Sequence, residues 1–213
     1  MSYTTPSFLH HCVVGERLVC LDLRSDRYFS LGEPLQTGFL AALRGEPIDA
    51  DDLLRLRGFG LLAEATPGSQ SRTFPPSAAE SVIEGATSGR AHLAQLPEVA
   101  ALVLASLLGV KVTPLAVLLA RAARAAPIRT SRVSAMQLVA DFLETRRLVP
   151  FPRVCLHDSL AMKAYLRRRG VASSLVFGVA LNPFSAHCWL QIGSTVLNDT
   201  LDRAVRHTPI LAV

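Results

Sequence analysis

Cysteine is scarce in this sequence, with four among 213 residues, and no two of the four form a CxxC pair. Secreted domains that are held together by disulfides contain cysteine at a much higher density. The first twenty residues also lack the basic start and the long apolar run of a secretory signal. We therefore expect reduced thiols and a cytoplasmic location.

Long hydrophobic runs are absent as well. The most apolar stretch, Val99–Val110, is followed by Lys111 and Pro114, and it falls short of the roughly 20 residues that cross a bilayer. The pattern predicts two buried helices and no transmembrane segment. It leaves a peripheral contact with a membrane open.

Basic residues outnumber acidic ones by five, but they are scattered along the chain. Residues 1–73 contain seven Lys or Arg and nine Asp or Glu, a net charge of −2, whereas residues 74–213 have a net charge of +7. The asymmetry indicates two parts with different surfaces. Because neither zinc-finger spacing nor an aromatic and basic RNA-binding pattern occurs, we expect no nucleic-acid partner. The sequence contains no glycine-rich phosphate-binding loop, so it indicates no nucleotide cofactor.

Composition divides the chain into a front part, residues 1–65, and a rear part, residues 90–213. The segment between them, residues 66–89, is rich in Pro, Ser, Thr and Gly and is predicted to be a linker. The front part reads as short strands within 13–31, then helices at 34–43 and 49–56. The rear part shows helical patterns at 91–107, 114–125, 131–146 and 155–169, then strands at 175–180, 186–192 and 195–200 and a tail. This order is an α+β arrangement.

Cys155 is predicted to lie in the first turn of a helix. Phe151-Pro152 does not fit inside a helix, and the basic run Arg167–Arg169 followed by Gly170 is typical of a helix end. A thiol at a helix N-terminus has a lowered pKa and is a candidate nucleophile. Taken alone, Cys155 is better explained as a small buried apolar residue, which is the usual environment of a free cysteine.

The strand pattern offers Cys155 two partners. Alternation places His187, Trp189 and Gln191 on one face of a strand and Cys188 on the other. A three-residue loop, Ile192–Ser194, would pair His187 with Asp199, whereas a two-residue loop would put Asp199 opposite Cys188. We predict the three-residue loop, in which Asp199 orients His187 and the imidazole faces the thiol. A zinc site of Cys155, His157 and His187 is disfavoured because His157 points away on the helix.

The string from Val154 to Asp199 resembles the catalytic half of the lasso-peptide maturation proteases, the B proteins of microcin-type lasso clusters, which are similar to transglutaminases in fold. The shared features are a Cys opening a helix with Ser-Leu four residues on, RRRG at its end, a PF-x-AH-x-W strand and a V-x-ND return. The resemblance implies that Cys155 is the nucleophile, His187 the base and Asp199 the orienting residue. Papain-like enzymes often use a Gln shortly upstream of the Cys as an oxyanion donor, whereas the residues upstream of Cys155 here are Arg147, Leu148, Val149 and Pro150. The Cys155 N–H and Trp189 are the candidates, with plain core as the alternative for Trp189.

The front part resembles the small winged-helix peptide-recognition domains related to the pyrroloquinoline quinone chaperone. Such domains take a leader peptide as an added strand, and Arg27–Leu31 could supply the sheet edge. The expected groove residues are Tyr28, Phe29, Leu31, Leu53 and Arg57. An accessory or DNA-binding domain is the alternative, although the net charge of −2 argues against DNA.

Together these features predict a two-part cysteine peptidase. The front part would hold the leader of a ribosomally made lasso precursor, and the rear part would cut it from the core. The resemblance implies a partner cyclase and proteolysis that depends on ATP through that partner. An acyltransferase or transglutaminase with the same triad, and a precursor-binding module without catalysis, are the alternatives.

Overall fold

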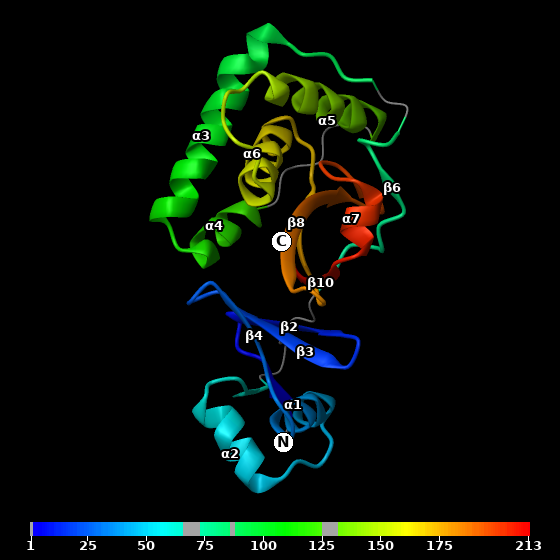
Figure 1. Cartoon of the computed structure of the whole chain (residues 1–213). Coiled ribbons are helices and arrows are strands. Elements are labelled where there is room, and N and C mark those ends of the chain that lie inside the picture. Colours follow the sequence, from blue (N-terminus) through cyan, green and yellow to red (C-terminus); the bar gives the residue numbers. More distant parts are fainter. Residues whose placement is uncertain (1, 66–72, 86–87, 125–131) are drawn as a thin grey trace. The chain divides into compact units, whose positions relative to one another are not determined.

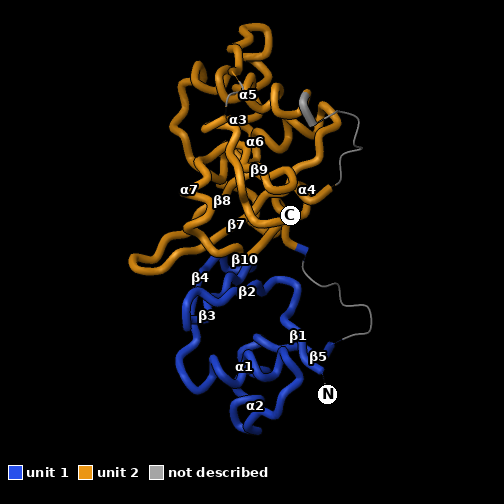
Figure 2. Tube along the Cα trace, turned by 90° about the vertical axis from the view of Figure 1, so that its right-hand side faces the viewer, with its two compact units in different colours: residues 1–73 blue, residues 74–213 orange. Residues whose placement is uncertain are grey.

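The structure is a computed structural model that describes residues 2–65, 73–85, 88–124 and 132–213. The chain forms two compact units, Met1–Thr73 and Phe74–Val213 (Figure 2). Each unit has its own strands and helices, and the two are described separately below.

The first unit mixes short strands with two helices. A three-stranded antiparallel sheet is formed by β2 (Leu9–Val14), β3 (Arg17–Asp22) and β4 (Arg27–Ser30), in the order β2-β3-β4. The helices are α1 (Leu35–Arg44) and α2 (Ala50–Gly58), and β1 (Tyr3–Thr4) pairs with β5 (Ala63–Glu64). The predicted strands and both predicted helices are thus confirmed.

Local signals explain these elements. Gly15 and Asp26 adopt positive φ in the two hairpin turns, a conformation that glycine and aspartate tolerate better than most residues. The Asp49 side chain accepts hydrogen bonds from the backbone N–H groups of Asp51 and Asp52 and so caps α2. Buried residues of the strands and helices meet in one core cluster: Leu9, Leu18, Cys20, Phe39, Ala42, Leu56, Leu61 and Leu62.

The second unit contains a five-stranded sheet in the order β10-β7-β8-β9-β6. Its strands are β6 (Glu80–Ser81), β7 (Ser174–Ala180), β8 (Ser185–Ile192), β9 (Thr195–Val196) and β10 (Thr208–Ala212). All pairs are antiparallel except β6 with β9. The tail expected at the C-terminal end is wrong, because it forms the short helix α7 (Leu201–Val205) and the edge strand β10.

Helix α6 (Cys155–Arg168) is central among the helices of this unit (Figure 1). It packs against β8, against α3 (Leu96–Val112) and against α5 (Arg132–Arg147), while α4 (Leu115–Ala122) lies beside it. A single 3-10 turn, Leu93–Gln95, precedes α3. The predicted start of α6 at Cys155 is confirmed, and Gly170 beyond its end has a φ of +72° as expected.

The structure differs from the sequence in the predicted linker, residues 66–89. Residues 66–72 and 86–87 lie outside the described residues, but 80–81 form β6 and pair with β9. A two-residue strand has too few positions for an alternating pattern, so composition alone could not reveal it.

The predicted register of β8 and β9 is wrong. Ile192 pairs with Thr195 across the two-residue loop Gly193-Ser194, and Gln191 pairs with Val196. The reason is Gly193, whose φ of +56° provides the conformation that two-residue hairpin turns need at their first position. The ladder ends at Val196, however, so this register does not fix the position of Asp199.

The expectation of two buried helices is also wrong in part. With its 3-10 turn, the helix Leu93–Val112 is long and apolar enough to cross a membrane by length and composition, and 22% of its most apolar window is buried. Core helices of soluble proteins can meet the same criterion. The unbroken run Val99–Val110 underestimated the length of this apolar helix.

Candidate active site

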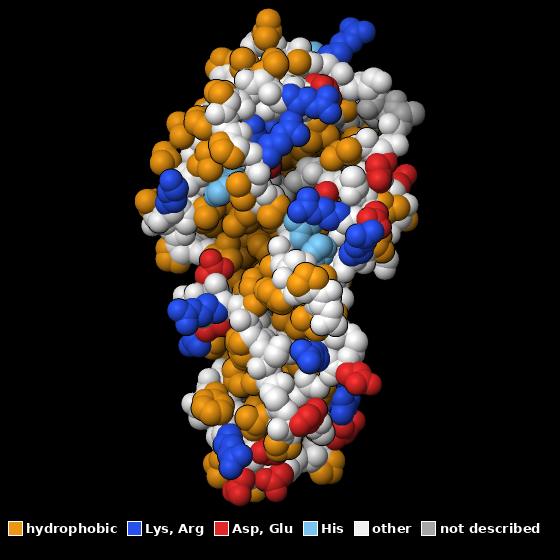
Figure 3. All heavy atoms as spheres, viewed as in Figure 1, with side chains coloured by type: hydrophobic (Ala, Val, Ile, Leu, Met, Phe, Trp, Pro, Cys, Tyr) orange, Lys and Arg blue, Asp and Glu red, His pale blue; other side chains and the backbone are white. Residues whose placement is uncertain are grey.

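Cys155, His187 and Asp199 line one cleft of about 260 Å³ in the second unit. They come from the tip of α6, from β8 and from the bend that follows β9. Figure 3 shows Lys and Arg side chains beside a hollow on the face of this unit, next to histidine. The cleft is lined by Ile83, Phe142, Leu143, Arg146, Arg153, Val154, Cys155, Asp158, Met162, His187, Cys188, Asn198, Asp199 and Arg203.

The Cys155 thiol sits at the N-terminus of α6 and is partly exposed. Hydrogen bonds from the Cys188 thiol and the His187 ring, helped by the backbone N–H of Cys188, lower the pKa of Cys155 to about 4 against its burial. Because this value lies well below neutral pH, Cys155 is a thiolate under ordinary conditions.

His187 is the cationic partner of that thiolate. Its Nε2 is hydrogen-bonded to Oδ2 of Asp199, which leaves Nδ1 for Cys155. Burial lowers the pKa of His187, but the hydrogen bonds and charges of Asp199 and Cys155 outweigh it and raise the pKa to about 9. Between pH 4 and pH 9 the pair is therefore thiolate and imidazolium.

Asp199 reaches His187 by leaving the sheet. After β9 the chain bends at 197–199, and the Asn198 side chain accepts the Leu190 N–H at 2.8 Å in place of a further strand residue. The Asn198 amide also donates to Ser159 Oγ of α6 at 2.8 Å. This single side chain ties the bend to both β8 and α6, so that the next residue faces the imidazole.

The Asp199 carboxyl is held in its ionised form. Burial raises its pKa, but hydrogen bonds from His187 and from the Thr200 N–H, with the charge of His187, lower the pKa below its usual range. The Ser81 hydroxyl donates to the backbone oxygen of Asp199. The segment predicted to be a linker thus braces the acidic residue.

The edge of β8 beside the bend explains how Cys188 takes part. Because β9 ends at Val196, the N–H groups of Leu190 and Cys188, two residues apart on β8, point to the same unpaired edge. Asn198 accepts the first, and the Cys155 sulfur accepts the second. The sulfur therefore lies against the strand backbone, where side chains from both faces reach it.

Arg146 fixes the chain that leads into α6. Arg146 is 3% exposed, and its guanidinium donates to Oδ1 of Asp158 at 2.7 Å. It also donates to the backbone oxygens of Val149, Phe151 and Pro152 at 3.1 to 3.2 Å. One buried cation thus clamps residues 149–152 to the first turn of the helix that bears Cys155.

Comparison with known proteins assigns the second unit to a family. A family model described as the transglutaminase-like superfamily matches residues 96–212, more than half of the chain. The chain belongs to the transglutaminase-like superfamily. It is also 41% identical over 49 residues to the Microcin J25-processing protein McjB of Escherichia coli. That match spans 23% of this chain and 24% of McjB, and no solved structure matches.

Trp189 does not have the position expected of an oxyanion donor in this transglutaminase-like domain. Its indole N–H donates to Oε1 of Gln191 at 3.0 Å, and its ring lies in a core cluster with Val176, Val196 and Ala204. The reason is the tight packing of the buried indole, which is 2% exposed. The Cys155 N–H remains as a candidate, because the first N–H groups of a helix have no partner within it.

The five residues expected in a leader groove of the first unit fall into three places. Phe29, Leu31 and Leu53 are half-buried and pack against the core cluster of this unit. Tyr28 lies on the opposite face of β4 from Phe29. Arg57 forms an exposed ion pair with Glu64 at 3.3 Å. Only the first three therefore share one environment, the core of this unit, and of these Phe29 lies on the edge strand β4.

Sequence reasoning missed three residues of the site: Arg146, Cys188 and Asn198. Alternation along β8 set Cys188 aside, because it could not show that the sulfur meets the strand edge. Asn198 stood beside Asp199 in the quoted V-x-ND return, and that adjacency was a usable signal. Arg146 resembled a cation at a helix C-terminus, and nothing local distinguished it from Arg147.

Proposed function

We propose that this protein is a cysteine peptidase that removes the leader from a ribosomally made lasso precursor peptide. The observation that supports it most is the hydrogen-bonded series Cys155, His187 and Asp199 beside a cleft. The superfamily match supports acyl chemistry at cysteine, and the partial similarity to McjB supports a peptide-processing role.

In the proposed reaction, the Cys155 thiolate attacks the carbonyl carbon of the amide between leader and core. The imidazolium of His187 donates its proton to the leaving nitrogen, and the core departs as a free amine. The leader remains as a thioester on Cys155. Water, deprotonated by His187, then attacks the thioester, and the leader leaves as a carboxylic acid.

Two features of the second unit would stabilise the transition states. Asp199 keeps the His187 ring oriented and favours its charged form. The oxyanion would form next to the N-terminus of α6, where the Cys155 N–H and the partial positive charge of the helix stabilise negative charge. In this proposal Trp189 acts through packing alone.

The first unit would hold the leader. Among the described residues β4 is an edge strand of its sheet, and a leader peptide could be added to such an edge as a further strand. Phe29 lies on β4, and Phe29, Leu31 and Leu53 are half-buried apolar residues. The same proposal includes a winged-helix identity for this unit and a cytoplasmic location for the protein. It also includes a partner cyclase that closes the freed amine onto a side chain, and an ATP requirement through that cyclase.

The test is mass spectrometry of the precursor peptide encoded beside this gene after incubation with three forms of the full chain. We expect the parent protein to release leader acid and free core, and Cys155→Ala to release neither. Cys12→Ala is the matched control, because burial raises the pKa of that thiol to about 11 and it lies in the other unit. This variant should cleave like the parent.

Two results would contradict the proposal. Cleavage by Cys155→Ala at the parent rate would show that Cys155 is not the nucleophile. A leader product joined to an added amine, with no free acid at any amine concentration, would indicate an acyltransferase that uses the same three residues.

A further inference from the structure

Helices α3 and α4 present apolar side chains to solvent. Leu104, Leu108 and Val112 lie four residues apart on one side of α3 and are 43%, 53% and 79% exposed. Val117 on α4 is 41% exposed. Figure 3 shows hydrophobic side chains gathered over this part of the second unit. A helix that served only as core would bury these positions.

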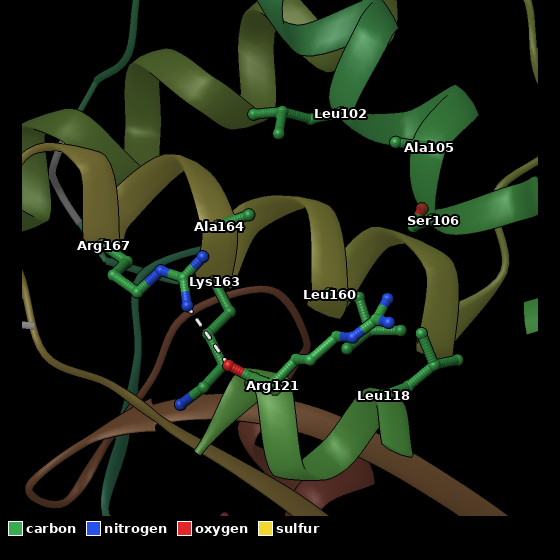
Figure 4. A pocket seen from close by; sticks show the side chains of 10 residues that line it. Leu102, Ala105, Ser106, Leu118, Arg121, Leu160, Lys163, Ala164 and Arg167 are labelled. Carbon is green, nitrogen blue, oxygen red and sulfur yellow. Dashed lines mark hydrogen bonds between the residues drawn. The ribbon is translucent and has the colours of Figure 1, made fainter. Parts of the chain in front are cut away.

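An apolar groove of about 270 Å³ lies between α3, α4 and α6, next to this face. Figure 4 shows side chains from all three helices around it, among them Leu102, Leu118 and Leu160. Arg121, Lys163 and Arg167 are the charged residues of the lining, which contains no carboxylate. The groove therefore combines an apolar lining with positive charge alone.

The sequence of this region is equally one-sided. No Asp or Glu occurs from Val99 to Ala140. The same stretch contains the basic residues Lys111, Arg121, Arg124, Arg129 and Arg132. Among the residues that the structure describes, neither Lys111 nor Arg121 forms an ion pair with a carboxylate. An anion is thus the missing complement of this face.

We propose that the α3–α4 face docks on the surface of an anionic phospholipid membrane. Leu104, Leu108 and Val112 would enter the boundary between headgroups and acyl chains, while Lys111 and Arg121 meet lipid phosphates. The helix lies along the surface and does not span it, because Val99 and Val103 on its other side are fully buried within the unit. A protein partner is less favoured, because protein surfaces commonly present both signs of charge.

The test is sedimentation of the full-length protein with vesicles of phosphatidylglycerol and phosphatidylcholine, or of phosphatidylcholine alone. We expect binding to the anionic vesicles only, weakened by added salt. Lys111→Ala should weaken binding about fivefold, since each cation near the surface contributes on the order of 1 kcal/mol. Leu108→Gln combined with Val112→Gln should weaken it about tenfold or more.

Matched controls lie in the first unit. Leu54→Gln changes a leucine that is 68% exposed, and Arg17→Ala removes an exposed cation, so both should bind vesicles like the parent. Unchanged cleavage of a soluble precursor by the α3 variants would show that they are folded. The proposal fails if the parent does not bind anionic vesicles. It also fails if the α3 variants alter the mass of the protein in analytical ultracentrifugation, because the face would then join two copies of the chain.

Discussion

Replacing Arg146 with methionine should separate the stability of the second unit from the positioning of its nucleophile. Methionine keeps most of the buried length but removes the cation that bonds Asp158 at 2.7 Å and the backbone oxygens of Val149, Phe151 and Pro152. The Asp158 carboxyl would then be partly buried without a counter-ion.

The expected cost follows from that contact. Removing one partner of a buried ion pair costs about 3–5 kcal/mol. The Asp158 side chain is 18% exposed, so water can compensate in part, and we expect a loss near the lower end, about 3 kcal/mol. Freed from the guanidinium, residues 149–152 would no longer fix the start of α6, and kcat should fall at least tenfold through misplacement of the thiolate.

The assay combines denaturant unfolding with cleavage kinetics for Arg146→Met, Arg146→Lys and Arg146→Met with Asp158→Asn. The double variant removes the unpaired charge, so stability should recover by about 1–2 kcal/mol while kcat stays low. Arg146→Lys can restore the ion pair but not the three carbonyl contacts. Parent-like kcat in the double variant would refute the positioning role, and parent-like stability of Arg146→Met would refute the clamp.

Three further outcomes are expected. Cleavage should rise with pH as Cys155 ionises near pH 4 and fall as His187 loses its proton near pH 9, and a profile with a single limb would contradict the ion pair. Cys188→Ala removes a hydrogen bond that lowers the pKa of Cys155, so the acidic limb of iodoacetamide alkylation should move to higher pH, and an unmoved limb would exclude that bond. Gly178→Ala would place a Cβ 2.8 Å from the Cβ of His207 and 2.9 Å from the Trp189 ring, so it should cost about 1–3 kcal/mol and lower Tm in a thermal scan, and an unchanged Tm would show that both neighbours can shift.

The first turn of α6 was predictable because its signals are local. Phe151-Pro152 does not fit inside a helix, so α6 begins after it. Gly170 supplies the positive φ beyond the last turn of the helix. These residues act within a few positions of the boundary that they set. The same holds for α2, whose Asp49 caps its own helix.

The sequence predicted Asp199 as the hydrogen-bond partner of His187, and the structure has this bond. The strand register from which it was predicted is wrong, however. Sequence alternation required a three-residue loop, whereas the loop has two residues and the ladder stops at Val196. The approach of Asp199 depends on Asn198 bonding both Leu190 and Ser159, and the second of these contacts joins elements 39 residues apart in sequence. No propensity or period describes such a contact.

The brace by β6 and the clamp by Arg146 escaped prediction for different physical reasons. Ser81 meets Asp199 across more than a hundred residues, which depends on how the chain folds back. Arg146 bonds residues at most twelve positions away, but its place in the last turn of α5 is typical of any cation at a helix end. The exposed side of α3 escaped too, because hydrophobicity alone does not distinguish a buried helix from one that faces a different partner.

The most direct measurement of the central claim is the intact mass of the protein during turnover with its precursor peptide. We expect a transient adduct equal to the leader in thioester linkage, located on Cys155 by peptide mapping, and no adduct on Cys155→Ala. Two results would contradict the account. One is leader release by the parent with the adduct on a residue other than Cys155. The other is leader release with no covalent intermediate when turnover is stopped by acid.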